Sequence, residues 1–405
     1  MVQGLVIVGA GQAAFSTASK LRSLKDDRPI TIVGLEAHAP YQRPPLSKKY
    51  LLGEMSFDRL LLRPEQWYQD NNVELRHSTW VEEIDRQAKQ LVLQNGSTLA
   101  YDQLVLATGA TPRHLPQDIG GDLSGVFTVR NKDDADRLSA EMKPGRRLLI
   151  IGGGYIGLEA AAVARHLGLE VTLIEMAERI LARVAAKETA DFIRAVHTGH
   201  GVMIREGMGL LRLIGANGRV VAAELSDGSR LDIDMVIVGI GVSPNDALAA
   251  RAGLSVRNGI LVDTFARTSD PDIFAVGDCA LQPWQGAEIR LESVQNAVDQ
   301  AEAVAAILAG GNQPYQPKPW FWSDQYDLKL QIAGLNLGYD ETILRPGVRE
   351  GSISIWYYRN ETFIAVDAIN DARAYVTGKK LLEMGKTPEK AVLRDAQSDL
   401  KQLLS

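Results

Sequence analysis

The amino-acid sequence predicts an α/β fold with two Rossmann-like dinucleotide-binding domains, followed by a C-terminal α+β domain. The first observation is an internal repeat, because a short apolar run, a glycine turn and a helix-forming segment occur at residues 5–14 and again at 148–157. The second is that each repeat continues into another apolar run that ends in an acid, Glu36 or Glu175, 27 or 23 residues after the first glycine. The third is that strand-like aromatic and β-branched runs appear in the last part of the chain, at residues 352–366.

Size and charge agree with this fold class and limit the partners. The chain has 405 residues, of which 45% are hydrophobic and 23% charged, enough for two to three globular domains. The net charge of −6 provides no positive field for nucleic acid or an anionic membrane. The longest apolar runs, such as residues 235–242, are far shorter than the ~20 residues of a membrane helix. A strand-like run begins at Leu5, which leaves no room for a signal peptide, so we expect a soluble cytoplasmic protein.

Cysteine and histidine usage narrows the chemistry. Cys279 is the one cysteine, so the chain cannot form an intrachain disulfide, a CxxC redox pair or a multi-cysteine metal site. We interpret it as a small buried apolar residue. Of the six histidines, only His197 and His200 are close neighbours, and without nearby carboxylates or cysteines we interpret them as surface residues. We therefore predict no metal site.

The remaining elements follow in chain order. Apolar runs that contain or end in glycine predict strands at residues 103–109, 234–241 and 273–278. An alanine-rich amphipathic segment predicts a helix at 292–309, and the Gly- and Pro-rich stretch behind it marks a boundary. Further along, the pattern predicts two antiparallel strands and two helices, at 352–358, 362–366, 371–384 and 388–404. The predicted domains are 1–112 with 243–318, then 113–242, then 319–405.

The two glycine turns have a physical rationale. The first glycine allows a tight strand-to-helix turn, the second lets the backbone approach a pyrophosphate, and the third small residue lets the helix pack on the strand. The positive end of the following helix faces the phosphates. These positions are Gly9, Gly11 and Ala14 in the first repeat and Gly152, Gly154 and Gly157 in the second. Glu36 is placed to accept hydrogen bonds from ribose hydroxyls, with a solvated loop carboxylate as the alternative.

Four segments identify a family resemblance. Residues 40–48 (PYQRPPLSK), 107–109 (ATG), 276–278 (VGD) and 320–326 (WFWSDQY) resemble the FAD-dependent ferredoxin reductases of the putidaredoxin reductase and dioxygenase reductase type. These proteins have a glutathione-reductase-like fold, and the similarity runs from end to end. The resemblance implies FAD at the first site, NADH at the second, and a [2Fe–2S] ferredoxin that serves a cytochrome haem monooxygenase or a ring-hydroxylating dioxygenase.

The resemblance also implies residues that hold FAD. Lys48 lies near the flavin, Asp278 binds the ribityl chain, and Val294 starts a helix whose positive end faces the flavin pyrimidine ring. Some relatives carry Asp at the position of Leu35, so the ribose contact moves here to Glu36. An ordinary surface lysine is the alternative for Lys48. The other implied FAD residues are Ala13, Arg43, Val81, Ala107, Thr108, Gly109, Arg130, Gly277 and Trp322.

At the second site, Glu175 occupies the position that recognises a ribose 2′-hydroxyl. A carboxylate repels a 2′-phosphate, which favours NADH over NADPH. Arg179 is interpreted as a helix-end or surface residue. For Glu159 two interpretations stay open, a hydrogen bond to the nicotinamide carboxamide or a plain helix-surface charge. The resemblance adds the remaining residues of this pocket, namely Tyr155, Ile156 and the turn that ends at Gly241.

The missing thiol decides where the electrons go. Related disulfide reductases and peroxidases use cysteines near the first site, but residues 41–52 contain none, so electrons must leave the flavin directly for a one-electron carrier. An acidic ferredoxin should dock on a locally basic face. Trp322 is a further candidate for this face, whereas Trp320 and Trp356 are also explained as core residues. The candidate docking cations are Arg43, Arg63, Arg290, Lys329 and Arg345.

Other functions remain open at this point. A rubredoxin reductase or an NADH oxidase-type flavoprotein would use the same two sites. A redox-sensing binding protein similar to apoptosis-inducing factor would form a long-lived complex of reduced flavin and NAD⁺. We expect a monomer.

Overall fold

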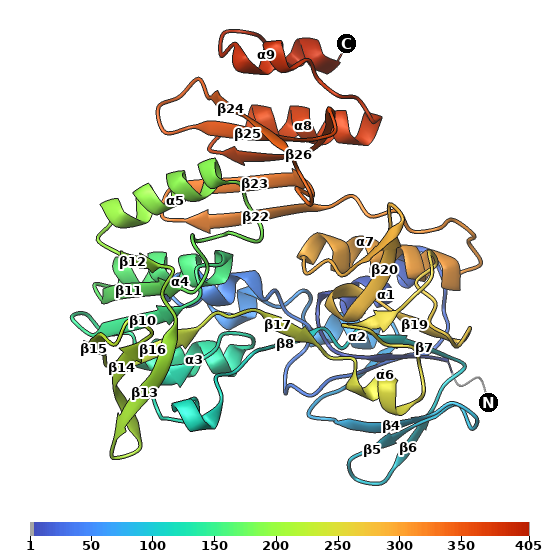
Figure 1. The fold of residues 1–405 in the computed structure, drawn as a ribbon. Helices are drawn as coiled ribbons and strands as arrows, with labels where there is room; N and C mark the ends of the chain where they lie inside the picture. The colour runs from blue at the N-terminus through green and yellow to red at the C-terminus, as the bar shows by residue number, and fades with distance from the viewer. Residues whose placement is uncertain (1–3, 405) are drawn as a thin grey trace. The chain divides into compact units, whose positions relative to one another are not determined.

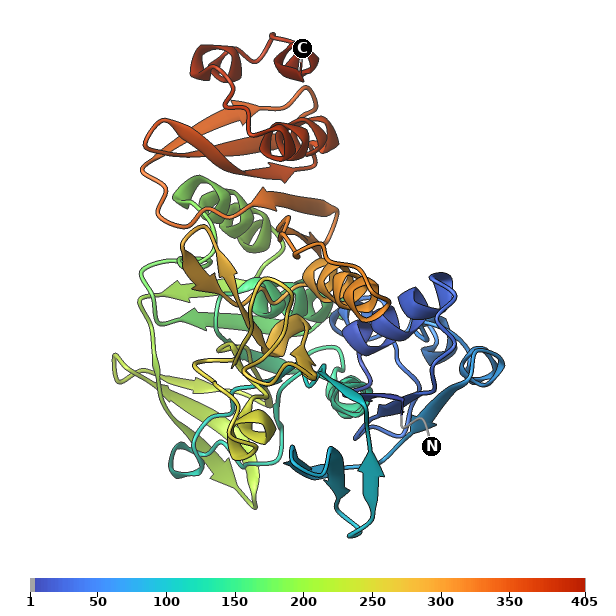
Figure 2. The same cartoon turned by 90° about the vertical axis from the view of Figure 1, so that its right-hand side faces the viewer.

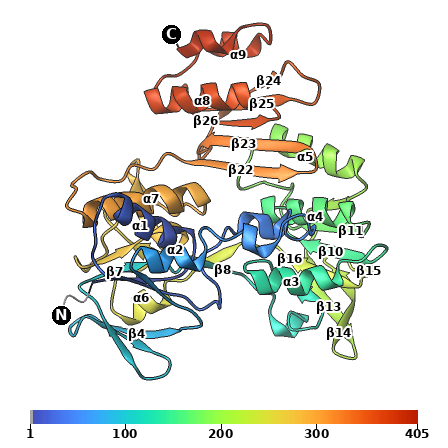
Figure 3. The ribbon, with the colours of Figure 1, turned by 180° about the vertical axis from the view of Figure 1, so that it is seen from behind.

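The computed structural model describes residues 4–404, which divide into two compact units. Unit 1 consists of residues 4–43, 56–111 and 242–319, and unit 2 of residues 44–55, 112–241 and 320–404. Figures 1 and 3 trace the chain through both. Unit 2 contains both the middle and the C-terminal predicted domains, so the division into three domains stays a prediction. Within the described residues, no helix is long and apolar enough to cross a membrane.

Unit 1 is built on a five-stranded parallel sheet in the order β19-β7-β1-β2-β3. Its strands are β1 (Leu5–Val8), β2 (Ile30–Val33), β3 (Val73–Arg76), β7 (Gln103–Leu106) and β19 (Ile273–Ala275). Their short apolar runs are buried, as expected where helices cover the faces of a parallel sheet. Two of its helices, α1 (Gln12–Ser23) and α7 (Val294–Leu308), share one hydrophobic cluster with the sheet.

Smaller elements complete unit 1. An antiparallel sheet joins β4 (Val81–Asp85), β5 (Gln90–Leu93) and β6 (Thr98–Ala100), and a second small sheet joins β18 (Ile260–Leu261), β20 (Ala280–Trp284) and β21 (Ala287–Ile289). Strands β8 (Ala110–Pro112) and β17 (Val242–Pro244) lie where the chain passes between the units. The remaining helices are α2 (Glu65–Asp70), α6 (Ala247–Arg251), η2 (Phe57–Arg59) and η4 (Gly277–Cys279).

Unit 2 repeats the parallel architecture in the order β12-β11-β10-β16-β9. Its strands are β9 (Val126–Phe127), β10 (Arg147–Ile151), β11 (Glu170–Glu175), β12 (Met203–Glu206) and β16 (Met235–Val238). A three-stranded antiparallel sheet of β13 (Leu210–Ala216), β14 (Arg219–Leu225) and β15 (Arg230–Asp232) accompanies it. The helices are η1 (Pro44–Ser47), η3 (Gln117–Ile119), α3 (Lys132–Glu141), α4 (Tyr155–His166) and α5 (Lys187–Gly199).

The C-terminal part of unit 2 is an antiparallel sheet in the order β22-β23-β26-β25-β24, with α8 (Ala372–Met384) beside it (Figure 2). Its strands are β22 (Trp320–Gln325), β23 (Leu328–Gly334), β24 (Glu341–Pro346), β25 (Ile353–Arg359) and β26 (Thr362–Ile369). Trp356 is fully buried and Trp320 packs on the same cluster, which confirms both as core residues. The predicted α/β and α+β fold is confirmed.

The helix predicted at 388–404 is wrong in its extent. The structure has a short helix, α9 (Lys390–Arg394), a break, and a 3₁₀ segment, η5 (Leu400–Leu404). The break occurs at Asp395, whose backbone is extended and whose side chain accepts from the amide of Gln397. Arg345 is the physical cause, because its buried guanidinium collects carbonyl oxygens between Val392 and Ser398 that a continuous helix would use itself.

Candidate functional site: two dinucleotide turns and a buried lysine–glutamate pair

The first glycine of each turn is required by its backbone. Gly9 has φ +115°, and a Cβ there would lie 2.1 Å from the carbonyl oxygen of Ala107. Gly152 has φ +107°, and its Cβ would lie 2.3 Å from the carbonyl oxygen of Gly239. In each case the glycine at the end of one strand meets the segment after the neighbouring parallel strand. The two turns are therefore constructed in the same way, and neither admits a side chain.

The second glycine leaves space in front of a helix. Gly11 and Gly154 are the N-caps of α1 and α4, and within the described chain neither helix has a side-chain cap and no atom lies within 4 Å of a Cβ built at either glycine. By contrast, Ser293 caps α7 by accepting from the amide of Asn296 at 3.1 Å. Uncapped amides at the positive end of a helix are suited to a pyrophosphate. Both sites fit a dinucleotide.

The third position differs between the repeats. Ala14 is fully buried with its methyl group accommodated. A Cβ at Gly157 would lie 2.2 Å from the carbonyl oxygen of Gly152, so α4 packs closer to its own turn. The packing role predicted for this position is present in both units, with less space in the second.

In unit 1 the structure brings together three residues predicted to hold FAD. Glu36 forms a 2.6 Å ion pair with Arg43 and accepts a 2.5 Å hydrogen bond from the hydroxyl of Tyr41. Burial lowers the pKa of Arg43, but Tyr41, Glu36 and Asp278 more than offset this and hold it above its ordinary value. Glu36 is thus an ion-paired residue and not a simple solvated loop carboxylate.

The other predicted FAD residues of unit 1 lie around α1 and α7. A Cβ at Gly277 would lie 3.4 Å from that of Ala13 and 3.6 Å from that of Ala297, so this turn sits against both helices. Val294 is the first residue of α7, as predicted. Val81 begins β4 and is buried, and Thr108, in the turn 107–109, donates to the carbonyl of Asn245 at 2.7 Å.

Two partners in this region were missed by sequence reasoning. Asn245 donates back to the carbonyl of Thr108 at 2.8 Å, and Gln300 accepts from the amide of Gly277 at 2.8 Å. The contacting residues are 137 and 23 positions apart, so no local pattern reports them.

In unit 2, Glu175 lies at the end of β11 beside the glycine turn. Its two carboxylate oxygens accept from the backbone amides of Gly153 and Ala177 at 2.7 and 2.8 Å. Arg179 folds onto its own loop and donates to the carbonyls of Ile180, Ala182 and Ala185. The guanidinium is thus occupied by backbone carbonyls, while the carboxylate is fixed at the turn.

Lys48 and Glu159 form a buried ion pair in unit 2. The Lys48 Nζ lies 2.9 Å from Glu159 Oε1, and their side chains are 17% and 4% exposed. Glu159 also accepts from the hydroxyls of Ser47 at 3.1 Å and Ser323 at 2.7 Å. Burial raises the pKa of Glu159, while Lys48 and the two hydroxyls act in the opposite direction. Glu159 as a plain helix-surface charge and Lys48 as an ordinary surface lysine are therefore both wrong.

The first turn of α4 carries two more predicted residues. Ile156 is half exposed, whereas the hydroxyl of Tyr155 is buried and has no hydrogen-bond partner among the described residues. The Tyr155 ring lies 5.0 Å from that of Phe321, which in turn lies 6.4 Å from that of Trp322.

Two further predicted residues of unit 2 lie outside α4. Arg130, which precedes α3, is half-buried and its amide donates to Asp134 at 3.0 Å. Gly241 has φ +95°.

The interpretation of His197 as a surface residue is wrong. His197 is fully buried on α5, where its Nε2 lies 2.8 Å from Gln325 Oε1 on β22. Burial lowers its pKa to about 4, so the ring is neutral at pH 7. His200 is exposed, as predicted, and stacks on the ring of Tyr326 at 3.7 Å.

A second buried acid lies in the C-terminal sheet. Asp367 on β26 is 1% exposed, and its Oδ2 accepts from Thr189 Oγ1 at 2.7 Å and from the Tyr357 hydroxyl. Its Oδ1 has no partner within residues 4–404. No sequence pattern distinguished this aspartate from its many exposed counterparts.

The prediction is wrong for two of the docking cations, Arg345 and Arg290, because their side chains are largely buried. Arg345 is 5% exposed and holds carbonyls of the C-terminal segment. The Arg290 side chain is 10% exposed, pairs with Glu292 at 2.5 Å and donates to the carbonyls of Asn258 and Asp278. Arg63 and Lys329 are exposed, with the Arg63 guanidinium 5.7 Å from the centre of the Phe15 ring.

Cys279 is fully buried, and its thiol donates to the carbonyl oxygens of Val276 and Leu106 at 3.3 and 3.4 Å. Burial raises its pKa. A protonated, enclosed thiol is a poor nucleophile, which confirms its interpretation as a small buried residue.

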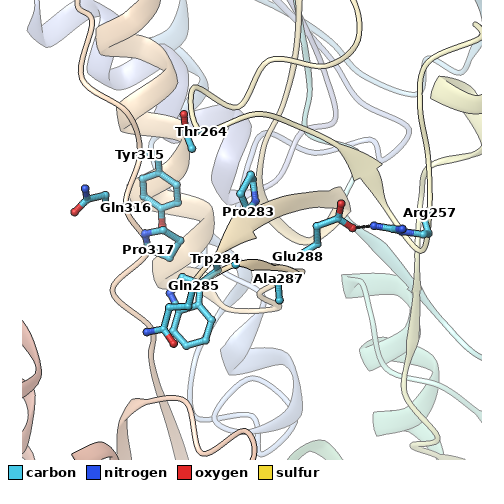
Figure 4. Close-up of a pocket in the computed structure, with 11 residues that line it drawn as sticks. Arg257, Thr264, Pro283, Trp284, Gln285, Ala287, Glu288, Tyr315, Gln316 and Pro317 are labelled. Atoms are coloured by element: carbon cyan, nitrogen blue, oxygen red, sulfur yellow. Dashed lines mark ion pairs between the residues drawn. The ribbon is translucent and has the colours of Figure 1, made fainter. Parts of the chain in front are cut away.

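An open pocket of about 780 Å³ lies in unit 1 between the β20–β21 hairpin and residues 315–317 (Figure 4). Pro283, Trp284 and Tyr315 line it, and the ion pair of Arg257 with Glu288 lies at one end. None of the described residues that line it belongs to a predicted nucleotide site. We therefore do not place the reaction site in this pocket, despite its volume.

The fold and the two turns define the class of protein. Parallel sheets that each present an uncapped helix end behind a glycine turn, together with a buried lysine–carboxylate pair, are typical of an oxidoreductase that uses two dinucleotides. The chain belongs to the pyridine nucleotide-disulphide oxidoreductase family, whose model matches residues 3–301, and residues 320–404 match the reductase C-terminal family.

Individual proteins agree with this membership. The chain is 43% identical to rhodocoxin reductase from Rhodococcus erythropolis over 98% of this chain and 93% of that one. The crystal structure of the ferredoxin reductase for the CYP199A2 system from Rhodopseudomonas palustris superposes with a TM-score of 0.96, at 42% identity and 99% coverage of both chains. The covalent putidaredoxin reductase–putidaredoxin complex contains a chain that matches with a TM-score of 0.96, at 38% identity, over 100% of this chain and 99% of that one. These matches confirm the resemblance found in the sequence.

Proposed function

We propose that this protein is an NADH-dependent, FAD-containing reductase that passes electrons to a [2Fe–2S] ferredoxin. That ferredoxin would serve a cytochrome haem monooxygenase or a ring-hydroxylating dioxygenase. The observation that carries the proposal is a combination of two features. Two glycine turns each precede a helix without a side-chain cap, and the single thiol of the chain is fully buried. The similarity to a chain crystallised as a covalent complex with putidaredoxin supports a protein partner.

FAD at the first turn supplies a hydride acceptor and a one-electron donor when bound. The α1 N-terminus binds its pyrophosphate, and the Glu36–Arg43 pair and Asp278 lie on the same unit to fix the ribose and ribityl hydroxyls. The N-terminus of α7, at Val294, provides positive potential for the reduced flavin. The second turn binds NADH, with Glu175 at the adenosine ribose.

The Lys48–Glu159 pair keeps a fixed ammonium in a partly desolvated position. Such a charge would orient a bound cofactor and would stabilise negative charge on it. Cys279 cannot form a mixed disulfide, because its thiol is buried and protonated. NADH delivers two electrons and the protein has no usable thiol, so the proposed acceptor is a one-electron carrier. We further propose that the protein acts as a monomer in the cytoplasm, where NADH is available.

The test is electron transfer from the purified, FAD-loaded protein. We expect NADH to bleach the flavin and a [2Fe–2S] ferredoxin to be reduced far faster than oxygen. Faster reduction of rubredoxin, or rapid NADH oxidation without any carrier, would contradict the proposal in favour of the related enzymes. A stable reduced flavin–NAD⁺ complex that changes oligomeric state and turns over slowly with every carrier would favour a redox-sensing binding protein.

A further inference from the structure

Strand β22 lies beside the helices α4 and α5 (Figure 1), and one face of the strand makes polar side-chain contacts with both. Ser323 and Gln325 are two residues apart and therefore lie on the same face of the strand. Ser323 donates to Glu159 on α4, and Gln325 contacts His197 on α5. This hydrogen-bonded row of side chains is buried away from water, because the exposed fractions of Ser323, Gln325 and His197 are 0%, 1% and 0%.

The hydrogen bonds of this chain have one direction. Gln325 Nε2 donates to Ser323 Oγ at 3.0 Å, so the single hydroxyl proton of Ser323 is left for Glu159 Oε1 at 2.7 Å. With its amide oriented in this way, Gln325 presents Oε1 to His197, which must carry its proton on Nε2. His197 Nδ1 then faces the hydroxyl of Tyr326 at 3.4 Å as an acceptor.

We propose that Ser323, Gln325 and His197 are positioning residues that hold Glu159 in its ionised form and so fix Lys48 for hydride transfer. The catalytic part of this statement rests on the proposed function. Each donor in the chain points toward the Glu159 carboxylate, and successive hydrogen bonds of one polarity strengthen one another. A proton on Glu159 Oε1 would have to be donated to Ser323 and would reverse every bond behind it, so the ionised carboxylate is the form that accepts from Ser323 without restriction. The C-terminal domain thereby controls the charge state of a residue on the NAD-binding helix.

The surroundings of Glu159 explain why such support is needed. Burial raises its pKa, and Lys48, from the segment after η1, is the cation that opposes this. η1 contributes the neutral Ser47, and β22 contributes the neutral Ser323. α5 contributes His197 two hydrogen bonds beyond Ser323, and burial keeps that imidazole uncharged. A single ion pair is thus assisted only by neutral donors whose orientation is set through β22.

The first experiment titrates Glu159 directly in the FAD-loaded, full-length protein. Glutamate labelled with ¹³C at the side-chain carboxyl is followed by NMR against pH, and Glu159→Gln assigns the resonance. We expect Ser323→Ala to raise the pKa of Glu159 by about one pH unit, because one hydrogen bond to the charged form is lost. Gln325→Met should raise it by less, since Ser323 remains but is free to rotate. Ser354→Ala is the matched control, because Ser354 is equally buried but accepts from Trp356 Nε1.

The second experiment needs no substitution that risks the fold. ¹⁵N chemical shifts of the His197 ring in the wild-type protein report its tautomer, and we expect neutral imidazole protonated on Nε2. A ring protonated on Nδ1 would overturn the proposal, because Gln325 would then have the opposite orientation. An unchanged Glu159 titration in both Ser323→Ala and Gln325→Met would overturn it as well.

Activity separates this inference from the function on which it rests. In Ser323→Ala the acidic limb of the pH profile for NADH-driven flavin reduction should move up with the pKa of Glu159, with a larger effect on kcat than on KM. A wild-type protein that shows the expected titration and tautomer but does not reduce its flavin with NADH would refute the proposed function alone. Normal reduction with an unmoved acidic limb in Ser323→Ala would refute the positioning role alone.

Discussion

The buried Asp367 predicts an unusual dependence of stability on pH. Its side chain is fully enclosed, Thr189 and Tyr357 both donate to Oδ2, and Oδ1 is left without a partner among residues 4–404. Burial raises its pKa from the usual 3.8 to about 6, and the two hydrogen bonds only partly oppose this. Between these two values the folded protein keeps a proton that the unfolded chain has lost.

The sign of the effect follows from that difference in proton binding. Because the pKa in the folded state is raised, the stabilising contribution of the protonated group is complete below pH 3.8 and is lost as the pH rises through about 6. At about 1.4 kcal/mol per pH unit, the full loss is about 3 kcal/mol. Roughly half of it, about 1.5 kcal/mol, falls between pH 5 and pH 8.

Asp367→Asn removes the titration while keeping the size of the side chain. We expect its free energy of unfolding, relative to wild type, to improve by about 1.5 kcal/mol between pH 5 and pH 8. Urea titrations of both proteins at half-unit pH steps measure this. Asp324→Asn is the control, because Asp324 is an exposed carboxylate in the same sheet. Parallel pH profiles for Asp367→Asn and wild type would refute the reasoning, since they would show that the buried carboxyl titrates as in the unfolded chain.

Three further predictions concern other parts of the molecule. Glu175→Ala should lower the ratio of kcat/KM for NADH over NADPH by about tenfold, equivalent to 1.4 kcal/mol, and an unchanged ratio would exclude a role at the ribose. Arg345→Met should cost about 3 kcal/mol and speed amide exchange at residues 392–398, whose carbonyls it binds; unaltered exchange there would contradict that anchoring role. Gly157→Ala should destabilise unit 2 by about 1–3 kcal/mol in thermal unfolding, because the added methyl group meets the Gly152 carbonyl. Gly154→Ala should weaken NADH binding at unchanged stability, because the described residues leave open space around Gly154.

The parts of the fold that the sequence predicts are those fixed by short-range patterns. Gly9 and Gly152 follow apolar runs of four residues, and both turn out to have positive φ against a neighbouring carbonyl. The alanine-rich pattern predicts the helix at 292–309, and the family resemblance implies Val294 as its start, which is where α7 begins. Turn geometry depends on neighbours along the chain, so one sequence is sufficient to locate the turns.

The site residues that were missed depend on partners far away in the chain. Ser323 and Glu159 are 164 residues apart, and His197 and Gln325 are 128 apart. A histidine in a polar, glycine-containing segment has the same local signature whether it is exposed or buried. Arg345 was misplaced for the same reason, because its five carbonyl partners lie 47 to 53 residues away. Burial of a polar residue is decided by tertiary structure, and sequence periodicity does not encode it.

The internal repeat also shows where equal motifs lead to unequal sites. Both acids follow their glycine turns at similar spacing, and the motif alone assigns both to a ribose. In the structure Glu36 is ion-paired with Arg43 and accepts from the Tyr41 hydroxyl, whereas Glu175 accepts from two backbone amides and has no ion pair among the described residues. An ion-paired acid repels an additional phosphate much less than an unpaired one does. The same motif therefore leaves the acid of the second turn, Glu175, better placed to repel a 2′-phosphate than the acid of the first turn, Glu36.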